Sequence, residues 1–247
     1  MRLSADRWLT DVLGFDVFRV NDAASMSAEE LDAVEGHFKD RSKALYYTKV
    51  DTCAVEAVGM LARLGFTVVD VNMTFAAPPA AIVAAVASGG AIDVAFAEDS
   101  QRAPVLDIAG SCFRYSRFHL DPLLTQGAAH HVKREWVASY FEGRRGDRLF
   151  VARVAGRIAG FLAAVMTEHA GRPAAAIDLV GVAADHQRAG VGRALARQFA
   201  AHYADCERVI VGTQAANVPS IRMYEGLGFR AVRSAYVLHR HVDSART

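Results

Sequence analysis

The sequence predicts an α/β (α+β) fold, in which helices and strands alternate along most of the chain. Apolar residues recur at i, i+4 and i+8 in segments such as 190–203, which is the spacing of one helix face. Segments such as 66–75 are rich in β-branched residues and end near proline or glycine, as strands do. Apolar residues make up 52% of the 247 residues and charged residues 22%, a balance that predicts a folded protein.

The length favours either one large domain or two small ones. An alanine-rich stretch that contains Pro78-Pro79 and Gly89-Gly90 interrupts the alternation of elements and marks a joint between two units. We therefore predict a smaller unit over residues 1–88 and a larger one over residues 93–247.

The smaller unit is expected to place two helices between three strands. Ser27 and Glu30 have the spacing of a capping box, and Gly65 stands where a helix end needs a positive φ. The predicted elements are strands over 15–20, 44–50 and 66–75 and helices over 27–38 and 54–64. The junction at 61–66 is echoed at 224–229, so the first unit is expected to resemble part of the second.

The larger unit begins after the joint and holds more elements. Its predicted helices cover 102–113, 124–141, 190–203 and 219–227, with a polar, aromatic loop over 116–122. Its predicted strands cover 94–97, 149–154, 158–166, 174–182, 209–212 and 229–239, and a tight turn at 155–157 joins two of them.

The charge pattern excludes several kinds of partner. Twenty-eight lysines and arginines stand against 27 acidic residues, for a net charge of +1, and no basic stripe predicts a nucleic-acid partner. The longest uncharged stretch, 71–92, is mostly alanine beyond its strand and is broken by proline and glycine, so no membrane span is expected. Charges near the start argue against a secretion signal, and the three cysteines lack zinc spacing, so we expect a cytoplasmic protein.

A turn that contains two glycines follows the strand predicted to end at Val182. Gly190 and Gly192 precede a helix, whose free N–H groups and positive potential suit a phosphate or pyrophosphate. Gln187, Arg188 and the arginine at 193 can add donors. The segment lacks the third glycine of the dinucleotide fingerprint and the lysine of a P-loop, so an ordinary helix start is the alternative.

A second polar segment, 213–229, follows the next strand. Asn217 is suited to cap a helix that has Pro219 in its first turn. Tyr224 then lies on that helix, within reach of a cleft at the strand end. Taken alone, this tyrosine is equally compatible with a half-buried structural aromatic residue.

Together the two segments resemble the acetyl-CoA signature of the GNAT superfamily of N-acetyltransferases. The resemblance rests on Gln187-x-x-Gly190-x-Gly192 and on Asn217-x-x-Ser220-x-x-x-Tyr224-x-x-x-Gly228-Phe229. It implies a mixed central sheet flanked by helices, preceded by a smaller, partial GNAT-like unit that walls the acceptor site. It also implies an acyltransferase that uses acetyl-CoA as co-substrate and no metal.

By this resemblance, the turn and the second helix would form the acetyl-CoA site. The residues assigned to it are Val180, Val182, Gln187, Arg188, Ala189, Gly190, Val191, Gly192, Arg193, Asn217 and Tyr224. The backbone of Val180 and Val182 would pair with the pantetheine arm, and the amides of 187–193 would bind the pyrophosphate. Asn217 would lie near the thioester, and Tyr224 would protonate the departing thiolate.

Asp178 is the candidate base for the attacking amine, because many members of the superfamily carry an acid on this strand. A shift of strand register by one residue would turn the side chain to the other face. A structural carboxylate is therefore the alternative.

A narrower resemblance, to the dTDP-fucosamine acetyltransferase family, extends over nearly the whole chain. It rests on Gly14-Phe15-Asp16, Leu64-Gly-Phe66, Ser116-Arg-Phe-His-Leu-Asp-Pro122, Trp136, Thr213-Gln214 with Asn217, and Ser234-Ala-Tyr-Val-Leu-His239. Such enzymes acetylate an amine on a nucleotide-linked aminodeoxy sugar, which predicts a role in polysaccharide biosynthesis. Arg117 would bind phosphate and Phe118 or His119 would stack on the substrate, whereas a plain structural turn is the alternative.

Two other functions stay open. One is a GNAT enzyme for a small amine such as an amino acid, an antibiotic or a polyamine. The other is a non-catalytic acetyl-CoA-binding module, against which Tyr224 and the glycine turn argue. His239 and His241 have no carboxylate partner at a clear spacing, so no metal site is expected. The apolar last strand is expected to pair across the interface of a homodimer.

Overall fold

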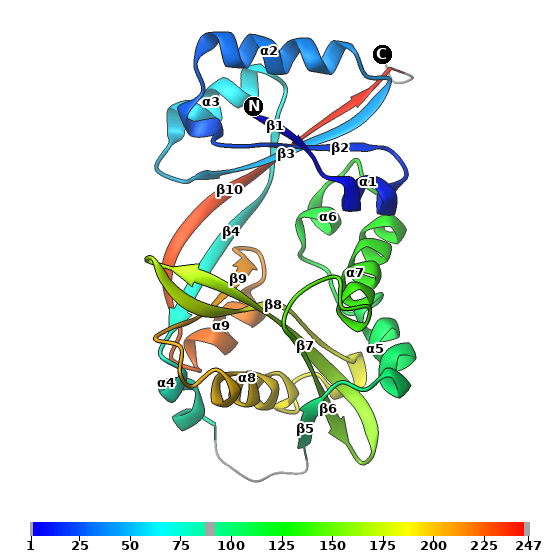
Figure 1. Cartoon of the computed structure of the whole chain (residues 1–247), viewed down its shortest axis with the longest axis vertical. Helices are drawn as coiled ribbons and strands as arrows, with labels where there is room; N and C mark the ends of the chain where they lie inside the picture. Colours follow the sequence, from blue (N-terminus) through cyan, green and yellow to red (C-terminus); the bar gives the residue numbers. More distant parts are fainter. Residues whose placement is uncertain (1, 87–91, 245–247) are drawn as a thin grey trace.

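One twisted sheet of ten strands, in the order β1-β2-β3-β10-β4-β9-β8-β7-β6-β5, runs through the molecule (Figure 1). The computed structural model describes residues 2–86 and 92–244. The strands are Leu3–Ala5 (β1), Asp16–Val20 (β2), Lys43–Asp51 (β3), Thr67–Ala77 (β4), Ile92–Phe96 (β5), Arg148–Val154 (β6), Arg157–His169 (β7), Arg172–Val182 (β8), Val209–Gln214 (β9) and Arg230–Asp243 (β10).

Helices cover both faces of this sheet (Figure 1). They are Arg7–Leu13 (α1), Ala28–Lys39 (α2), Val55–Arg63 (α3), Pro79–Ala84 (α4), Arg102–Ala109 (α5), Arg117–Leu120 (α6), Gln126–Phe141 (α7), Val191–His202 (α8) and Val218–Glu225 (α9). Within the described ranges, no helix combines the length and the apolar character needed to cross a membrane.

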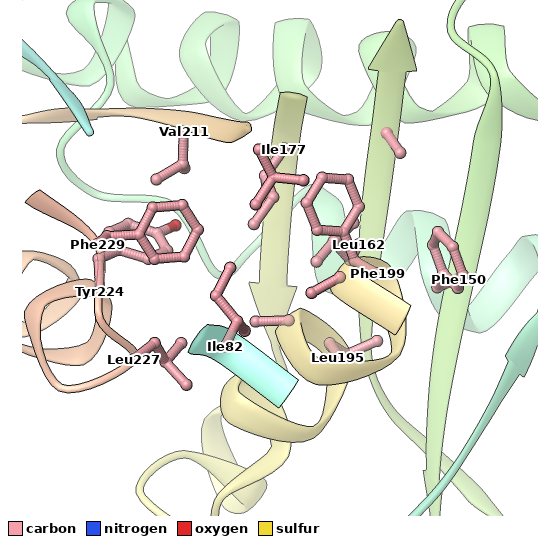
Figure 2. Close-up of a cluster of buried hydrophobic side chains, with 14 of the residues drawn as sticks. Ile82, Phe150, Leu162, Ile177, Leu195, Phe199, Val211, Tyr224, Leu227 and Phe229 are labelled. Carbon is pink, nitrogen blue, oxygen red and sulfur yellow. The ribbon is translucent and has the colours of Figure 1, made fainter. Parts of the chain in front are cut away.

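Alternation along the strands separates the two layers of the core. On β6, Phe150 and Ala152 join the cluster under α8, whereas Leu149 and Val151 join the cluster under α5 and α7. Successive side chains of a strand point to opposite faces, so a strand buried on both sides reads as a continuous apolar run. Figure 2 shows the α8 side, where Leu195 and Phe199 pack over Leu162 and Ile177.

The last strand, β10, lies in the middle of the sheet. It pairs antiparallel with β3 on one edge and with β4 on the other. The expectation that this strand pairs across a homodimer is wrong, because both edges already have partners within the chain. The sheet also runs across the division predicted between 1–88 and 93–247, and the joint at Gly89-Gly90 lies outside the described residues.

The predicted elements of both units are found, most of them within a few residues of their expected ends. The capping box of α2 is confirmed, and Gly65 has the expected positive φ of 77°. The sequence analysis missed β1 and α1, which are only three and seven residues long. It also assigned a loop to 116–122, where Ser116 precedes the single helical turn of α6.

A buried polar network fastens α6 to the middle of the sheet. The Asp121 carboxylate accepts hydrogen bonds from His239 Nδ1 at 2.6 Å and from His241 Nε2 at 2.7 Å. His239 Nε2 lies 3.1 Å from Arg117, whose guanidinium stacks 3.9 Å from the centre of the Tyr47 ring on β3. The network therefore joins elements of both predicted units.

Asp121 is the carboxylate partner that the sequence analysis did not find, because it lies 118 residues from His239. The ligand atoms of Asp121, His239 and His241 lie within 4.8 Å of one another, and these residue types can bind metals. In the structure they bond to each other, and His239 turns its second nitrogen to the Arg117 cation. The absence of a metal stays a prediction.

The network predicts how stability depends on pH. Burial, and to a smaller extent Arg117, lowers the pKa of His239 to about 4. Between pH 6.5 and 4 only the unfolded chain protonates this histidine, so the free energy of unfolding should fall as the pH falls, by up to about 3 kcal/mol. A His239→Asn variant should be less stable at pH 7, and its deficit should shrink over that range.

Urea unfolding of both proteins at several pH values measures this deficit. A deficit that stays constant between pH 6.5 and 4 would contradict the prediction.

Candidate functional site

The site begins where two parallel strands part. β8 and β9 pair only through Ala175–Ile177 and Val209–Val211, although β8 continues to Val182 and β9 to Gln214. Beyond this point the facing edges have no ladder between them. A cavity of about 670 Å³ opens there, lined by both strands and by the N-terminal ends of α8 and α9.

A β-bulge lies at the start of this opening. Ala163 on β7 pairs with Leu179 and Ala164 pairs with Ile177, which leaves Asp178 as an extra residue on β8. A bulge bends its strand and redirects one side chain. This explains why the face of Asp178 could not be derived from simple alternation.

The glycine turn forms one wall of the cavity. Arg188 and Gly190 both have positive φ, 63° and 88°, and α8 starts directly after them. A Cβ on Gly192 would lie 2.9 Å from Met223 Sδ, so this glycine lets α8 pack closely against α9. The free N–H groups of the first turn and the helix potential favour an anion here.

Most residues predicted for the acetyl-CoA site line this one cavity. They are Val180, Val182, Gln187, Arg188, Gly190, Val191, Gly192, Arg193, Asn217 and Tyr224. Ala189 is exposed in the same turn and does not line it.

Two of these side chains have structural contacts that the sequence analysis did not assign. The Arg193 guanidinium donates to the Ala85 carbonyl at 2.8 Å and reaches the Gly226 carbonyl at 3.4 Å, so it joins the ends of α4 and α9. Gln187 donates to the Val182 carbonyl at 3.3 Å. The backbone of the turn is therefore better placed to bind a pyrophosphate than the Arg193 side chain.

Asn217 is confirmed as the N-cap of α9. Its Oδ1 accepts from Ser220 N at 3.4 Å, and its Nδ2 donates to Thr213 Oγ1 at 3.3 Å. This cap fixes the first turn of the helix that carries Tyr224.

Tyr224 is only 3% exposed and lines the cavity. Its ring packs beside Phe229 and Phe75, with ring centres 5.5 Å and 6.3 Å away, and Figure 2 shows it next to Phe229. Burial raises the pKa of Tyr224 well above its ordinary value. The phenol therefore carries its proton at neutral pH.

Asp178 also lines the cavity, but its Oδ2 is fully engaged. It accepts hydrogen bonds from Trp136 Nε1 at 2.8 Å, Tyr140 OH at 2.7 Å and Arg145 Nε at 3.0 Å. Burial opposes ionisation, but the Arg145 cation and these hydrogen bonds outweigh it, so the pKa of Asp178 lies below its ordinary value. A carboxylate held in this way is a weak proton acceptor.

The predicted substrate residues are not brought into the cavity. Arg117 is engaged with Tyr47 and His239, and Phe118 is 1% exposed in the core. His119 is 6% exposed, and its Nδ1 lies 2.6 Å from Ser116 Oγ. Their role in binding substrate stays a prediction.

Neighbouring residues line the cavity instead. Arg114, Tyr115 and Ser116 precede α6 and line the same cavity as Asp178. The described residues that line the cavity all come from 112–224, so the first unit does not supply the wall that was expected of it. It acts from behind, because β4 pairs with β9 and holds that side of the opening in place.

Sequence analysis missed Lys133, which lines the cavity from α7 and is 7% exposed. Its ammonium lies 4.9 Å and 5.1 Å from the ring centres of Trp136 and Phe113. Burial lowers the pKa of Lys133 to about 8. The available signal was its place beside Val132 and four residues before Val137, on the apolar face of the helix.

Comparisons with known proteins agree with this geometry. Residues 105–229 match the model of the acetyltransferase (GNAT) family. The spore coat polysaccharide biosynthesis protein SpsD of Bacillus subtilis (strain 168) is 28% identical over 141 residues, which is 55% of this chain. The match spans 46% of SpsD, so it covers about half the length of that relative.

Solved structures share the fold over nearly the whole chain. A GCN5-related N-acetyltransferase from Kribbella flavida has a TM-score of 0.61 at 16% identity and covers 96% of this chain and 86% of its own. A tandem GNAT protein from the clavulanic acid biosynthesis pathway has a TM-score of 0.62 at 14% identity, covering 92% and 75%. With half of its length matched by the family model and a parted β8–β9 pair beside a glycine turn, the chain belongs to the acetyltransferase (GNAT) family.

Proposed function

We propose that this protein is an acetyl-CoA-dependent N-acetyltransferase whose acceptor is the amino group of a nucleotide-linked aminodeoxy sugar. The observation that carries the transferase activity is one cavity that contains the glycine turn, the unpaired edge of β8 and the Tyr224 phenol. The acceptor class is supported by the resemblance of the 116–122 segment and by the polysaccharide biosynthesis named for SpsD.

The cavity fits acetyl-CoA in shape and in chemistry. Its turn presents backbone N–H groups for a pyrophosphate, and the edge of β8 beyond Ile177 offers backbone groups that a pantetheine amide can pair with. Gly192 keeps α9 close to α8, which sets Tyr224 near the point where the strands part. Acetyl-CoA supplies the activated acyl group.

The reaction then needs one group that protonates the departing sulfur and one route by which the acceptor amine loses its proton. The acceptor amine forms a C–N bond to the carbonyl carbon and loses a proton to solvent, while the C–S bond breaks and the sulfur leaves as a thiolate. Tyr224 donates its phenolic proton to the departing sulfur and recovers one from solvent, so the products are an acetamide and a free thiol. The phenol is protonated at neutral pH and lines the cavity, which supports this role.

We propose that Asp178 is a positioning residue. The engaged Oδ2 and the low pKa argue against a base, and the carboxylate instead joins Trp136 and Tyr140 on α7 to the bulge of β8. The acidic residue of this strand thus holds α7 against β8 beside the cavity.

Replacement of Tyr224 by phenylalanine should lower kcat about 100-fold or more, because the leaving thiolate loses its acid. The KM for acetyl-CoA should change little, since the ring and its packing are kept. Steady-state and single-turnover kinetics measure both. Tyr203→Phe is the matched control, because Tyr203 is also buried but donates to Asp147 outside the cavity. An unchanged kcat with chemistry rate-limiting would refute the acid role.

Replacement of Asp178 by asparagine should lower the free energy of unfolding by about 1–3 kcal/mol at pH 7, because Arg145 loses its partner. The wild-type advantage should fade as the pH falls below about 4, where the unfolded carboxyl becomes protonated. The shape of the kcat/KM profile between pH 6 and 9 should be kept.

Urea unfolding and pH–rate profiles measure these effects. Asp107→Asn, which removes an exposed partner of Arg134, should cost under about 0.5 kcal/mol. Loss of one limb of the pH–rate profile with normal stability would identify Asp178 as the base instead.

A screen of acceptors by CoA release tests the substrate class. Turnover is expected with a nucleotide-linked aminodeoxy sugar, in preference to an amino acid, an aminoglycoside or a polyamine. Turnover on free amines alone would mean that the protein is a GNAT enzyme whose acceptor is not a sugar nucleotide. Binding of acetyl-CoA without turnover of any amine would favour the non-catalytic module.

A further inference from the structure

Lys133 is a buried cation without an anion. Its residue is 7% exposed, and among residues 2–86 and 92–244 its ammonium has neither a carboxylate within ion-pair distance nor a hydrogen-bond acceptor. Its described neighbours are the faces of Trp136, Phe113 and Phe118, the last with its ring centre 6.0 Å away. Removing an ammonium from water costs free energy unless an anion or a hydrogen-bond acceptor compensates for the lost hydration. A ligand that brings such a group into the cavity is therefore favoured.

The position of Lys133 assigns it to one end of the cavity. The turn and helix ends that suit acetyl-CoA and the side chains of 112–116, Lys133 and Asp178 line the same cavity. With acetyl-CoA on the turn and on the edge of β8, the acceptor is left with the space beside 112–116, Lys133 and Asp178. On this placement Lys133 lies beside the acceptor.

The charges around this end do not cancel. The negative charge of Asp178 favours the protonated form of Lys133, but Arg145 already pairs with Asp178 at 3.0 Å. Arg117 lies outside the cavity, where Tyr47 and His239 hold its guanidinium, but its positive charge also acts on Lys133. Arg114 is exposed and lines the cavity as well.

We propose that Lys133 anchors an anionic group of the acceptor, so that the enzyme selects amines that carry a phosphate or a carboxylate. The inference deepens the proposed function and relies on it only for the place of the reacting amine. The ammonium binds the anion by a charge-assisted hydrogen bond, which the burial of the lysine among aromatic rings strengthens.

The surrounding rings support a charged lysine over a neutral one. Aromatic faces attract an ammonium, and a pKa of about 8 leaves most of the population protonated at pH 7. A protonated lysine cannot take the proton of the amine. It also repels a polycation, so a polyamine or an aminoglycoside is a poor acceptor for this cavity.

Three acceptors and two substitutions test the proposal. The acceptors are a nucleotide-linked 4-amino-4,6-dideoxy sugar, its methyl glycoside without phosphate, and an L-amino acid. Lys133→Met keeps the apolar stem and removes the charge, whereas Lys133→Arg keeps a cation. Lys43→Met is the control, because Lys43 also lies over an aromatic ring, 4.8 Å from the centre of Phe15, but away from the cavity.

Lys133→Met should raise the KM of whichever anionic amine is a substrate about 10- to 100-fold, with kcat within about threefold. Lys133→Arg should keep most of the affinity, and Lys43→Met should behave as wild type. The KM of the methyl glycoside should not change in any variant. A fall of kcat for charged and uncharged acceptors alike would make Lys133 a proton acceptor and overturn the proposal, as would an unchanged KM.

A binding measurement separates this proposal from the proposed function. With the acetyl-CoA site saturated by CoA, dTDP or the amino acid should raise the melting temperature of wild type and not of Lys133→Met. If only the amino acid is turned over and the Lys133 variants still change its KM, the sugar nucleotide is not the acceptor but Lys133 does bind the anionic group. If the sugar nucleotide is turned over but dTDP does not shift the melting temperature, the proposed function stands and the role of Lys133 is wrong.

Discussion

The parting of β8 and β9 is the constraint from which the functional geometry follows. β9 stays with β4 as far as Gln214, and β8 stays with β7, so each strand keeps one partner while the three-residue ladder between them ends. Backbone groups on the facing edges must then find other partners, and a bound ligand can supply them. The glycine turn, the cap of α9 and Tyr224 all lie around this one opening.

The bulge at Asp178 gives the opening a fixed shape. An extra residue bends β8 at the point where its pairing with β9 ends. The Asp178 carboxylate then holds Trp136 and Tyr140, which lie one helical turn apart on α7. Because residues three apart share a helix face, fixing Trp136 also directs Lys133 toward the same space. One carboxylate thus joins α7 to the bulge of β8 beside the cavity.

Local patterns predicted the elements and the acetyl-CoA motif, whereas long-range pairing decided what could not be predicted. The capping box of α2 and the N-cap Asn217 are encoded within four residues, so sequence suffices for them. The bulge at Asp178 has no local signature, and the partner of His239 lies 118 residues away. β10 lies in the middle of the sheet because it pairs with β3 and β4, which are more than 150 residues away from it in the sequence. From the sequence, an interior lysine such as Lys133 can be recognised only as a charged residue on the apolar face of a helix.

The net charge of +1 is compatible with the proposed anion-binding site, because that site relies on the burial of one cation and not on a large number of surface cations. Exposed cations separated by more than about 10 Å are screened by salt and contribute little to one another's field. Lys133 is buried, with 7% of the residue exposed, so its charge acts through a lower effective dielectric than the charge of a surface lysine. The Asp178–Arg145 pair cancels one positive charge nearby, and the central network holds the Arg117 guanidinium against Tyr47 and His239. The buried Lys133 is left without an anion partner among the described residues, which supports the proposed selection of an anionic acceptor without a basic surface.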